Sequence, residues 1–137
     1  MTAHDAPRRR STLIILSLSA LMLGSLGLVL LFAPEETSSA LGWGGGVAAP
    51  SLAAGGLLAL AVLDWTGRGA LFGGVYGRPI VLANLVLALT GGLALLRTQA
   101  STTDAPAAGW IPVAVLLLHG VGFTFILLGR VGGPGGR

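Results

Sequence analysis

Charged side chains are scarce in this sequence. Aspartate, glutamate, lysine and arginine together make up 9% of its 137 residues, whereas 53% of the residues are hydrophobic. Water-soluble chains are usually about one quarter charged. A helix that crosses a bilayer needs roughly 20 mainly apolar residues, and the chain has four uncharged stretches of about that length or longer, residues 11–34, 37–63, 79–96 and 105–129. The shortage of charge therefore predicts an integral membrane protein with four spans.

Cysteine and lysine are both missing from the chain. Without cysteine there is no disulfide, no thiolate metal ligand and no thiol redox chemistry, which excludes membrane enzymes that use a dithiol pair. The eight basic residues are all arginine and the net charge is only +3, too small and too scattered for a nucleic-acid interface. No catalytic, cofactor-binding or metal-binding motif is evident. The sequence therefore favours a non-enzymatic role, with no cofactor and no nucleic-acid partner.

Proline and glycine mark the ends of the expected helices. Pro50, Pro79 and Pro112 each fall in a first turn, where the missing N–H costs nothing, whereas Pro34 and Gly67 end the first two helices. We predict an all-α fold, a four-transmembrane-helix bundle in residues 12–130, preceded by a basic tail (1–11) and followed by a flexible tail (131–137). The expected spans cover about residues 12–33, 48–66, 79–97 and 110–129.

Arginine is distributed unequally between the two sides of the expected bundle. Arg97 alone falls on one side, and the other side has Arg8, Arg9, Arg10, Arg68, Arg78, Arg130 and Arg137. Because short loops rich in basic residues stay in the cytoplasm, we predict that both termini are cytoplasmic. The alternative is a signal peptide cleaved near Ser38–Ala40, but the first apolar stretch is longer than the roughly 7–15 residues of a signal core.

Few polar side chains interrupt the spans, namely Ser17, Ser19, Ser25, Ser51, Asn84, Thr90, His119 and Thr124. No carboxylate is expected at mid-membrane. Counted inward from the predicted cytoplasmic ends of the spans, five of these residues form two layers about 8 Å apart, with Ser17, Asn84 and Thr124 in the first layer and Thr90 and His119 in the second. A direct contact between Asn84 and His119 is therefore not expected unless the helices are offset. One interpretation is interhelical hydrogen bonding worth on the order of 0.6 kcal/mol per bond. The other is an intramembrane ligand or substrate site formed by Asn84, Thr90, His119 and Thr124.

The stretch "LDWTGRGALFGGVYGRP", residues 63–79, gathers charged and aromatic residues between the second and third spans. Its glycines are not a dinucleotide-binding fingerprint, because that motif requires a preceding strand and a following amphipathic helix. Arginine beside tryptophan and tyrosine is typical of a lipid headgroup interface. We expect contacts with anionic lipid or an acidic partner from Asp64, Trp65, Arg68, Tyr76 and Arg78, with Asp64 pairing with Arg68. A purely topological role for the arginines is the alternative.

Residues 63–85, "LDWTGRGALFGGVYGRPIVLANL", resemble a pattern of uncharacterised small bacterial four-span membrane proteins. In that pattern Asn or Asp with Trp precedes a basic-glycine turn, Gly-Gly, an aromatic residue, Arg-Pro and an Asn in the next helix. The size and four-span layout are also similar to those of DoxX-like membrane proteins, some of which accompany quinone-linked oxidoreductases. The resemblance implies a multi-pass protein of the bacterial inner membrane.

Three roles remain open from the sequence. The first is an accessory or scaffold component, as a homo-oligomer or within a larger membrane complex. The second, implied by the DoxX-like layout, is a subunit of a membrane quinone-linked redox complex. The third is a small transporter or lipid-binding protein with a cavity near His119. A cofactor-bearing partner would distinguish the second role, and a polar cavity would distinguish the third.

Overall fold

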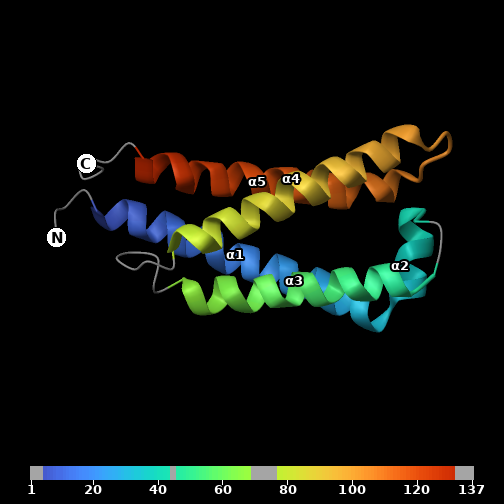
Figure 1. Ribbon diagram of the computed structural model, residues 1–137, viewed down its shortest axis with the longest axis horizontal. Coiled ribbons are helices and arrows are strands. Elements are labelled where there is room, and N and C mark those ends of the chain that lie inside the picture. Colours follow the sequence, from blue (N-terminus) through green and yellow to red (C-terminus); the bar gives the residue numbers. More distant parts are fainter. Residues whose placement is uncertain (1–4, 44–45, 69–76, 132–137) are drawn as a thin grey trace.

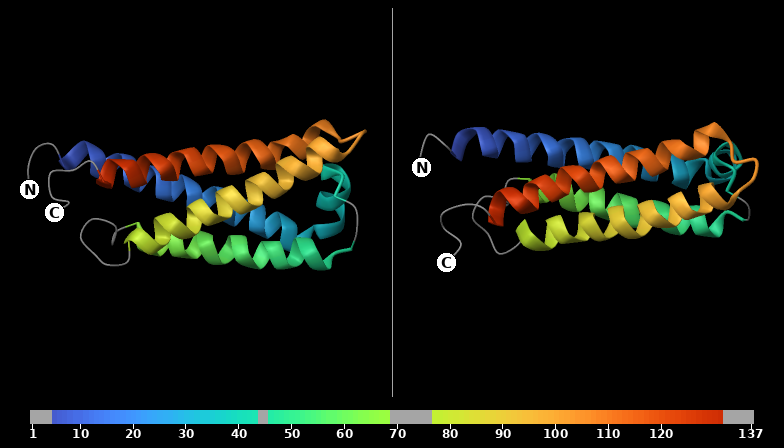
Figure 2. Two further views of the ribbon diagram at one scale, coloured as in Figure 1. Left: turned by 45° about the horizontal axis from the view of Figure 1, so that its top comes forward. Right: turned by 90° about the horizontal axis from the view of Figure 1, so that it is seen from above.

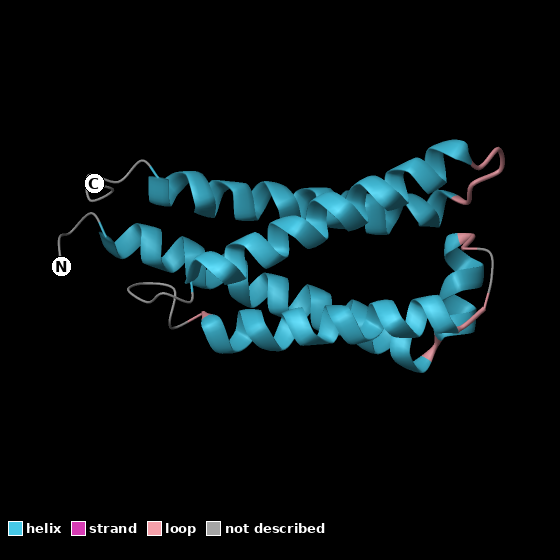
Figure 3. Cartoon of the chain, viewed as in Figure 1, coloured by secondary structure: helices cyan, strands magenta, loops and turns pink. Residues whose placement is uncertain are grey.

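The computed structural model describes residues 5–43, 46–68 and 77–131, and within these ranges the chain is helical apart from short connections (Figures 1 and 3). The elements are α1 (Asp5–Phe32), α2 (Pro34–Leu41), α3 (Ala48–Gly67), α4 (Gly77–Ser101), the 3-10 helix η1 (Ala107–Gly109) and α5 (Trp110–Val131). Four segments are long and apolar enough to cross a membrane: Arg10–Phe32, Ala48–Gly67, Gly77–Ser101 and Ala107–Leu128. The predicted all-α fold with four candidate spans is thereby confirmed.

The four long helices form two pairs. α1 packs along α3, and α4 packs along α5, whereas contacts between the two pairs are sparser (Figure 1). α1 begins and α5 ends at the same end of the bundle, which we call the terminal end. Which side of a membrane the terminal end faces stays a prediction.

The short helix α2 lies across the opposite end, which we call the far end (Figure 2). It was not predicted from the sequence. Ala33 leaves the helical region, with φ −133° and ψ 55°, because a residue that precedes a proline is disfavoured there. Pro34 then occupies the first turn of α2, and Gly42 ends the helix in the left-handed conformation with φ 69°, which glycine adopts without steric cost.

Helix lengths also differ from the predicted ones. α1 begins at Asp5, so residues 5–11 of the expected basic tail belong to a helix. α4 continues to Ser101, four residues beyond the predicted end of the third span. Hydropathy identifies only the part of a helix that lies in the hydrocarbon core of the bilayer. A polar extension of the same helix has low hydropathy and is therefore not detected.

Two apolar clusters at different levels make up most of the core among the described residues. Towards the terminal end, residues of α1, α4 and α5 meet, namely Leu16, Ile80, Val81, Phe123 and Ile126. Further along, α1 and α3 enclose a second cluster of Leu23, Leu30, Ala54, Leu57 and Ala61. Large apolar side chains also cover the outside, with exposed fractions of 80% for Leu52 and 71% for Leu118. An apolar core inside an apolar surface is what a bundle surrounded by lipid requires.

Candidate functional site in a buried polar chain

One polar side chain from each long helix lies between the two apolar clusters. Ser19 (α1) donates a hydrogen bond through Oγ to Asp64 Oδ2 (α3). Asn84 (α4) donates through Nδ2 to Asp64 Oδ1 at 2.7 Å. His119 (α5) has its Nε2 atom 2.9 Å from Asn84 Oδ1. These four residues, which we call the polar chain, connect all four long helices.

The orientation of the Asn84 amide follows from its neighbours. Nδ2 lies 2.7 Å from a carboxylate oxygen of Asp64 and 2.9 Å from the carbonyl oxygen of Ile80, and both of these atoms only accept from it. In the opposite orientation the amide oxygen of Asn84 would face these two acceptors and could form no hydrogen bond with either. With Oδ1 turned to His119, the histidine must carry a hydrogen on Nε2 and donate it, since an amide oxygen has none to give. The polar chain thus has one consistent assignment of donors and acceptors.

Burial of the polar chain is nearly complete. Asp64 and Asn84 are 0% exposed, and Ser19 and His119 are 4% and 7% exposed. A carboxylate away from water is tolerated only when hydrogen bonds replace its hydration, and Ser19 and Asn84 supply one bond to each oxygen of Asp64. The His119 ring also packs on Phe123, with ring centroids 4.7 Å apart.

The buried face of α3 explains why Asp64 points inward. This face consists of Pro50, Ala54, Leu57, Ala61, Asp64 and Gly67, which recur every three or four residues. Asp64 therefore continues the same stripe that packs on α1, one turn before the helix ends. The prediction that Asp64 lies at a lipid interface and pairs with Arg68 was wrong. The spacing to Ala61 and Leu57 was the signal that could have placed it inside.

Three other residues of the predicted interface, Trp65, Arg68 and Arg78, are at least partly exposed. The Arg68 guanidinium stacks over the Trp65 ring, with 3.5 Å between its carbon and the ring centroid. Trp65 is 47% exposed, and Arg78 is exposed at the start of α4. Tyr76 lies outside the described residues. Contact of this region with anionic lipid stays a prediction.

The structure brings together two of the four residues of the predicted intramembrane site. Asn84 and His119 meet, but Thr90 and Thr124 are exposed and donate to carbonyls of their own helices, Val86 at 2.6 Å and Gly120 at 2.8 Å. A contact between Asn84 and His119 was expected only if the helices are offset, and the contact is present. The helices are offset, because α5 extends further than α4 at the terminal end (Figure 1). Residues at different counts from the two helix ends therefore lie at one depth.

Two groups in the polar chain can gain or lose a proton, the Asp64 carboxyl and the His119 imidazole, and the Asn84 amide links them. Among the described residues, no group of three histidine, cysteine, aspartate or glutamate side chains could hold a metal ion. The arrangement is therefore suited to fastening helices together or to holding a proton within the bundle.

Comparison of the chain with protein-family models, with curated proteins and with solved structures found no match. The family resemblance, the DoxX-like layout and the bacterial origin therefore stay predictions from the sequence. What the chain does has to be inferred from the geometry of the polar chain and of the bundle around it.

Proposed function

We propose that this protein is a non-catalytic integral membrane component of the accessory or scaffold kind, in which the polar chain holds two helix pairs in one fixed arrangement. The observation that supports it is the hydrogen bond between Asp64 and Asn84. Asp64 belongs to the α1–α3 pair and Asn84 to the α4–α5 pair, so this bond joins two units that otherwise share sparse contacts.

Hydrogen bonds between helices are important in a lipid environment. Apolar helices are not driven together by the hydrophobic effect inside a bilayer, so packing and interhelical hydrogen bonds decide which faces meet. The polar chain supplies three of these bonds at one level, and its members satisfy one another. A pair that slid by one turn would leave a carboxylate and an amide in hydrocarbon, which is costly. The polar chain therefore selects one register between the two pairs.

The experiment compares unfolding of the purified protein in detergent for Asn84→Leu and Thr124→Val. Asn84→Leu removes the central member and leaves Asp64 and His119 without their shared partner, so we expect a loss of about 2–3 kcal/mol. Thr124→Val removes a hydroxyl that bonds only its own helix and should change stability by less than about 0.5 kcal/mol. Equal stability of the two variants would contradict the proposed role.

A second candidate, a small proton-linked transporter, is supported by one observation. Asp64 is a fully buried carboxyl connected through Asn84 to a histidine, and ionisable residues inside membranes often belong to proton pathways. Asp64→Asn separates the two candidates. The Ser19 hydroxyl can turn to accept from the new amide, so the helices stay joined, but the ionisable group is gone.

The corresponding measurement is proton flux into liposomes that contain the protein and a trapped pH-sensitive dye. A scaffold predicts no flux above that of empty liposomes for either protein. A proton-linked transporter predicts flux for the wild type and loss of that flux in folded Asp64→Asn. The redox-subunit role has a different test, since such a subunit should co-purify with a cofactor-bearing partner.

A further inference from the structure

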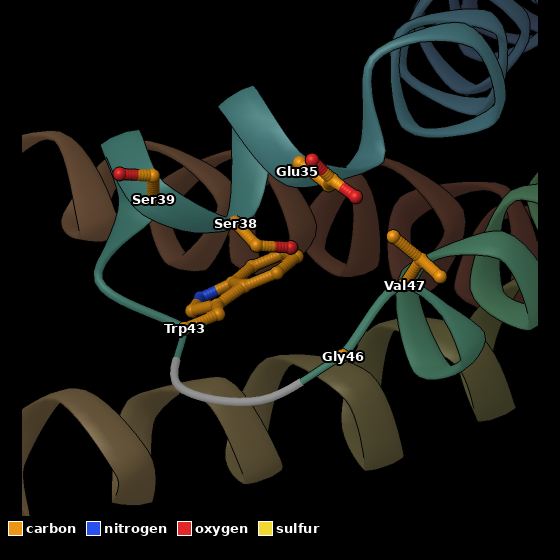
Figure 4. A pocket seen from close by; sticks show the side chains of 6 residues that line it. All are labelled: Glu35, Ser38, Ser39, Trp43, Gly46 and Val47. Atoms are coloured by element: carbon orange, nitrogen blue, oxygen red, sulfur yellow. The ribbon is translucent and has the colours of Figure 1, made fainter.

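An open pocket of about 470 Å³ lies at the far end of the bundle, beside α2 (Figure 4). We call it the far-end pocket. Its volume falls within the roughly 300–1,000 Å³ typical of small-ligand sites. It lies in the connection between the end of α1 at Phe32 and the start of α3 at Ala48, where two candidate spans end. The lining residues are Glu35, Ser38, Ser39, Trp43, Gly46 and Val47.

Two polar atoms of this lining have no hydrogen-bond partner among the described residues. They are Ser38 Oγ and Trp43 Nε1, both buried, and the Ser38 residue as a whole is only 9% exposed. Every member of the polar chain, by contrast, is hydrogen-bonded. Buried unpaired donors are rare in native proteins and call for a water molecule or a ligand. Trp43 Nε1 can only donate and therefore requires an acceptor, and the Ser38 hydroxyl can donate to the same kind of group.

The far-end pocket also offers a negative charge and an aromatic ring. Glu35 lies in the first turn of α2 and is exposed, and its carboxylate lies at the edge of the pocket that also holds the Trp43 ring (Figure 4). A carboxylate and an indole face both attract an ammonium group. The pocket therefore combines donors for an anion with partners for a cation.

The pocket and the end of α1 both carry exposed apolar side chains. Val47, in the lining itself, is 43% exposed, and Phe32, the last residue of α1, is 81% exposed. Apolar surface at the end of a span meets acyl chains, and the polar groups beyond it meet headgroups. A ligand with an apolar tail, a phosphate and an ammonium group would match the apolar side chains, the hydrogen-bond donors and the carboxylate, respectively.

We propose that the far-end pocket binds the headgroup of an ammonium-bearing phospholipid such as phosphatidylethanolamine. Ser38 Oγ–H and Trp43 Nε1–H donate to phosphate oxygens, and Glu35 pairs with the ammonium group. Because both donor atoms are covered in this structure, binding includes a turn of the Ser38 hydroxyl and of the Trp43 ring towards the lipid. The site is independent of the polar chain, which lies at a different level of the bundle.

The test is native mass spectrometry of the full-length protein in detergent with equal amounts of phosphatidylethanolamine and phosphatidylglycerol. We expect the wild type to retain phosphatidylethanolamine about threefold better, the ratio that one exposed ion pair provides. Glu35→Gln should reduce that ratio to about one. Glu36→Gln is the matched control, because Glu36 is the neighbouring acid and does not line the pocket, and it should leave the ratio unchanged.

Ser38→Ala and Trp43→Phe test the phosphate contacts. Each should lower the retention of both lipids by a similar factor, since both lipids carry a phosphate, while the thermal midpoint confirms that the variant is folded. Soluble glycerophosphoethanolamine, added as a competitor, should displace the lipid only at large excess because it lacks acyl chains. The proposal is overturned if Glu35→Gln and Glu36→Gln retain the two lipids in the same ratio, or if the soluble headgroup competes as well as the lipid itself.

Discussion

Asn84 bonds both ionisable residues of the polar chain at once, with Nδ2 2.7 Å from Asp64 Oδ1 and Oδ1 2.9 Å from His119 Nε2. Its two contacts are of different kinds. The first crosses between the helix pairs, and the second lies within the α4–α5 pair. Asn84 therefore has more influence on the assembly than His119, which bonds only within its own pair.

Replacing His119 should accordingly cost less than replacing Asn84. His119→Leu unpairs only Asn84 Oδ1 and keeps an apolar side chain beside Phe123, so we expect a loss of about 0.5–1.5 kcal/mol in detergent unfolding. The comparison with Asn84→Leu under the same conditions is the internal control. A loss for His119→Leu as large as that for Asn84→Leu would contradict the greater influence of the amide.

Close approach of α1 and α3 depends on Gly27. A Cβ atom there would lie 2.8 Å from Leu58 Cγ and 3.2 Å from the carbonyl oxygen of Ala54, and the backbone oxygen cannot move without moving α3. Gly27→Ala should therefore destabilise the bundle by about 1–3 kcal/mol. Gly55→Ala is the control, because a Cβ at Gly55 would have nothing within 4 Å. Thermal unfolding of both variants checks this, and equal midpoints would refute it.

The end of α2 should be sensitive to substitution at Gly42. Its φ of 69° strains any residue with a Cβ, and that Cβ would lie 2.6 Å from Pro106 Cδ. We expect Gly42→Ala to lower stability by about 1–2 kcal/mol. Hydrogen exchange should show the loss of protection concentrated in α2 (Pro34–Leu41), with little change in α4. Uniform loss over all helices, or none, would contradict this account.

Orientation is tested by reporter fusions at the two termini. The excess of arginine on the terminal side predicts that both reporters are cytoplasmic. Replacing Arg8, Arg9 and Arg10 by Gln should weaken that preference and give a mixed population. Reporters found on opposite faces of the membrane would instead support cleavage near Ala40.

Much of the fold could be predicted because hydropathy and proline positions are local signals. The apolar runs predict four spans, and Pro50, Pro79 and Pro112 indicate where three of the helices begin. α2 was missed although its signals were present, with Pro34 in the first turn, Glu35 and Glu36 beside it and Gly42 after its end. It is too short and too polar to appear in a search for spans.

The polar chain could not be assembled from the sequence for a different reason. Which residues meet depends on how far each helix is shifted along its neighbour, and hydropathy does not specify that shift. Counting from the helix ends placed Asn84 and His119 at different depths, although they are in contact. Asp64 was predicted at the surface because charged and aromatic residues surround it in the sequence, and its place on the buried stripe with Ala61 is a weaker signal. The sequence shows Ser19 as a polar residue within a span, but it does not indicate that Asp64 is its hydrogen-bond partner.

The central claim, that the Asp64–Asn84 bond joins the two helix pairs, is tested most directly by a double-mutant cycle. Asp64→Leu, Asn84→Leu and the double variant are unfolded in detergent beside the wild type. We predict that the double variant loses clearly less stability than the sum of the two single losses, with a coupling of about 1–3 kcal/mol, as expected for residues in direct contact. Losses that add without coupling would contradict the claim.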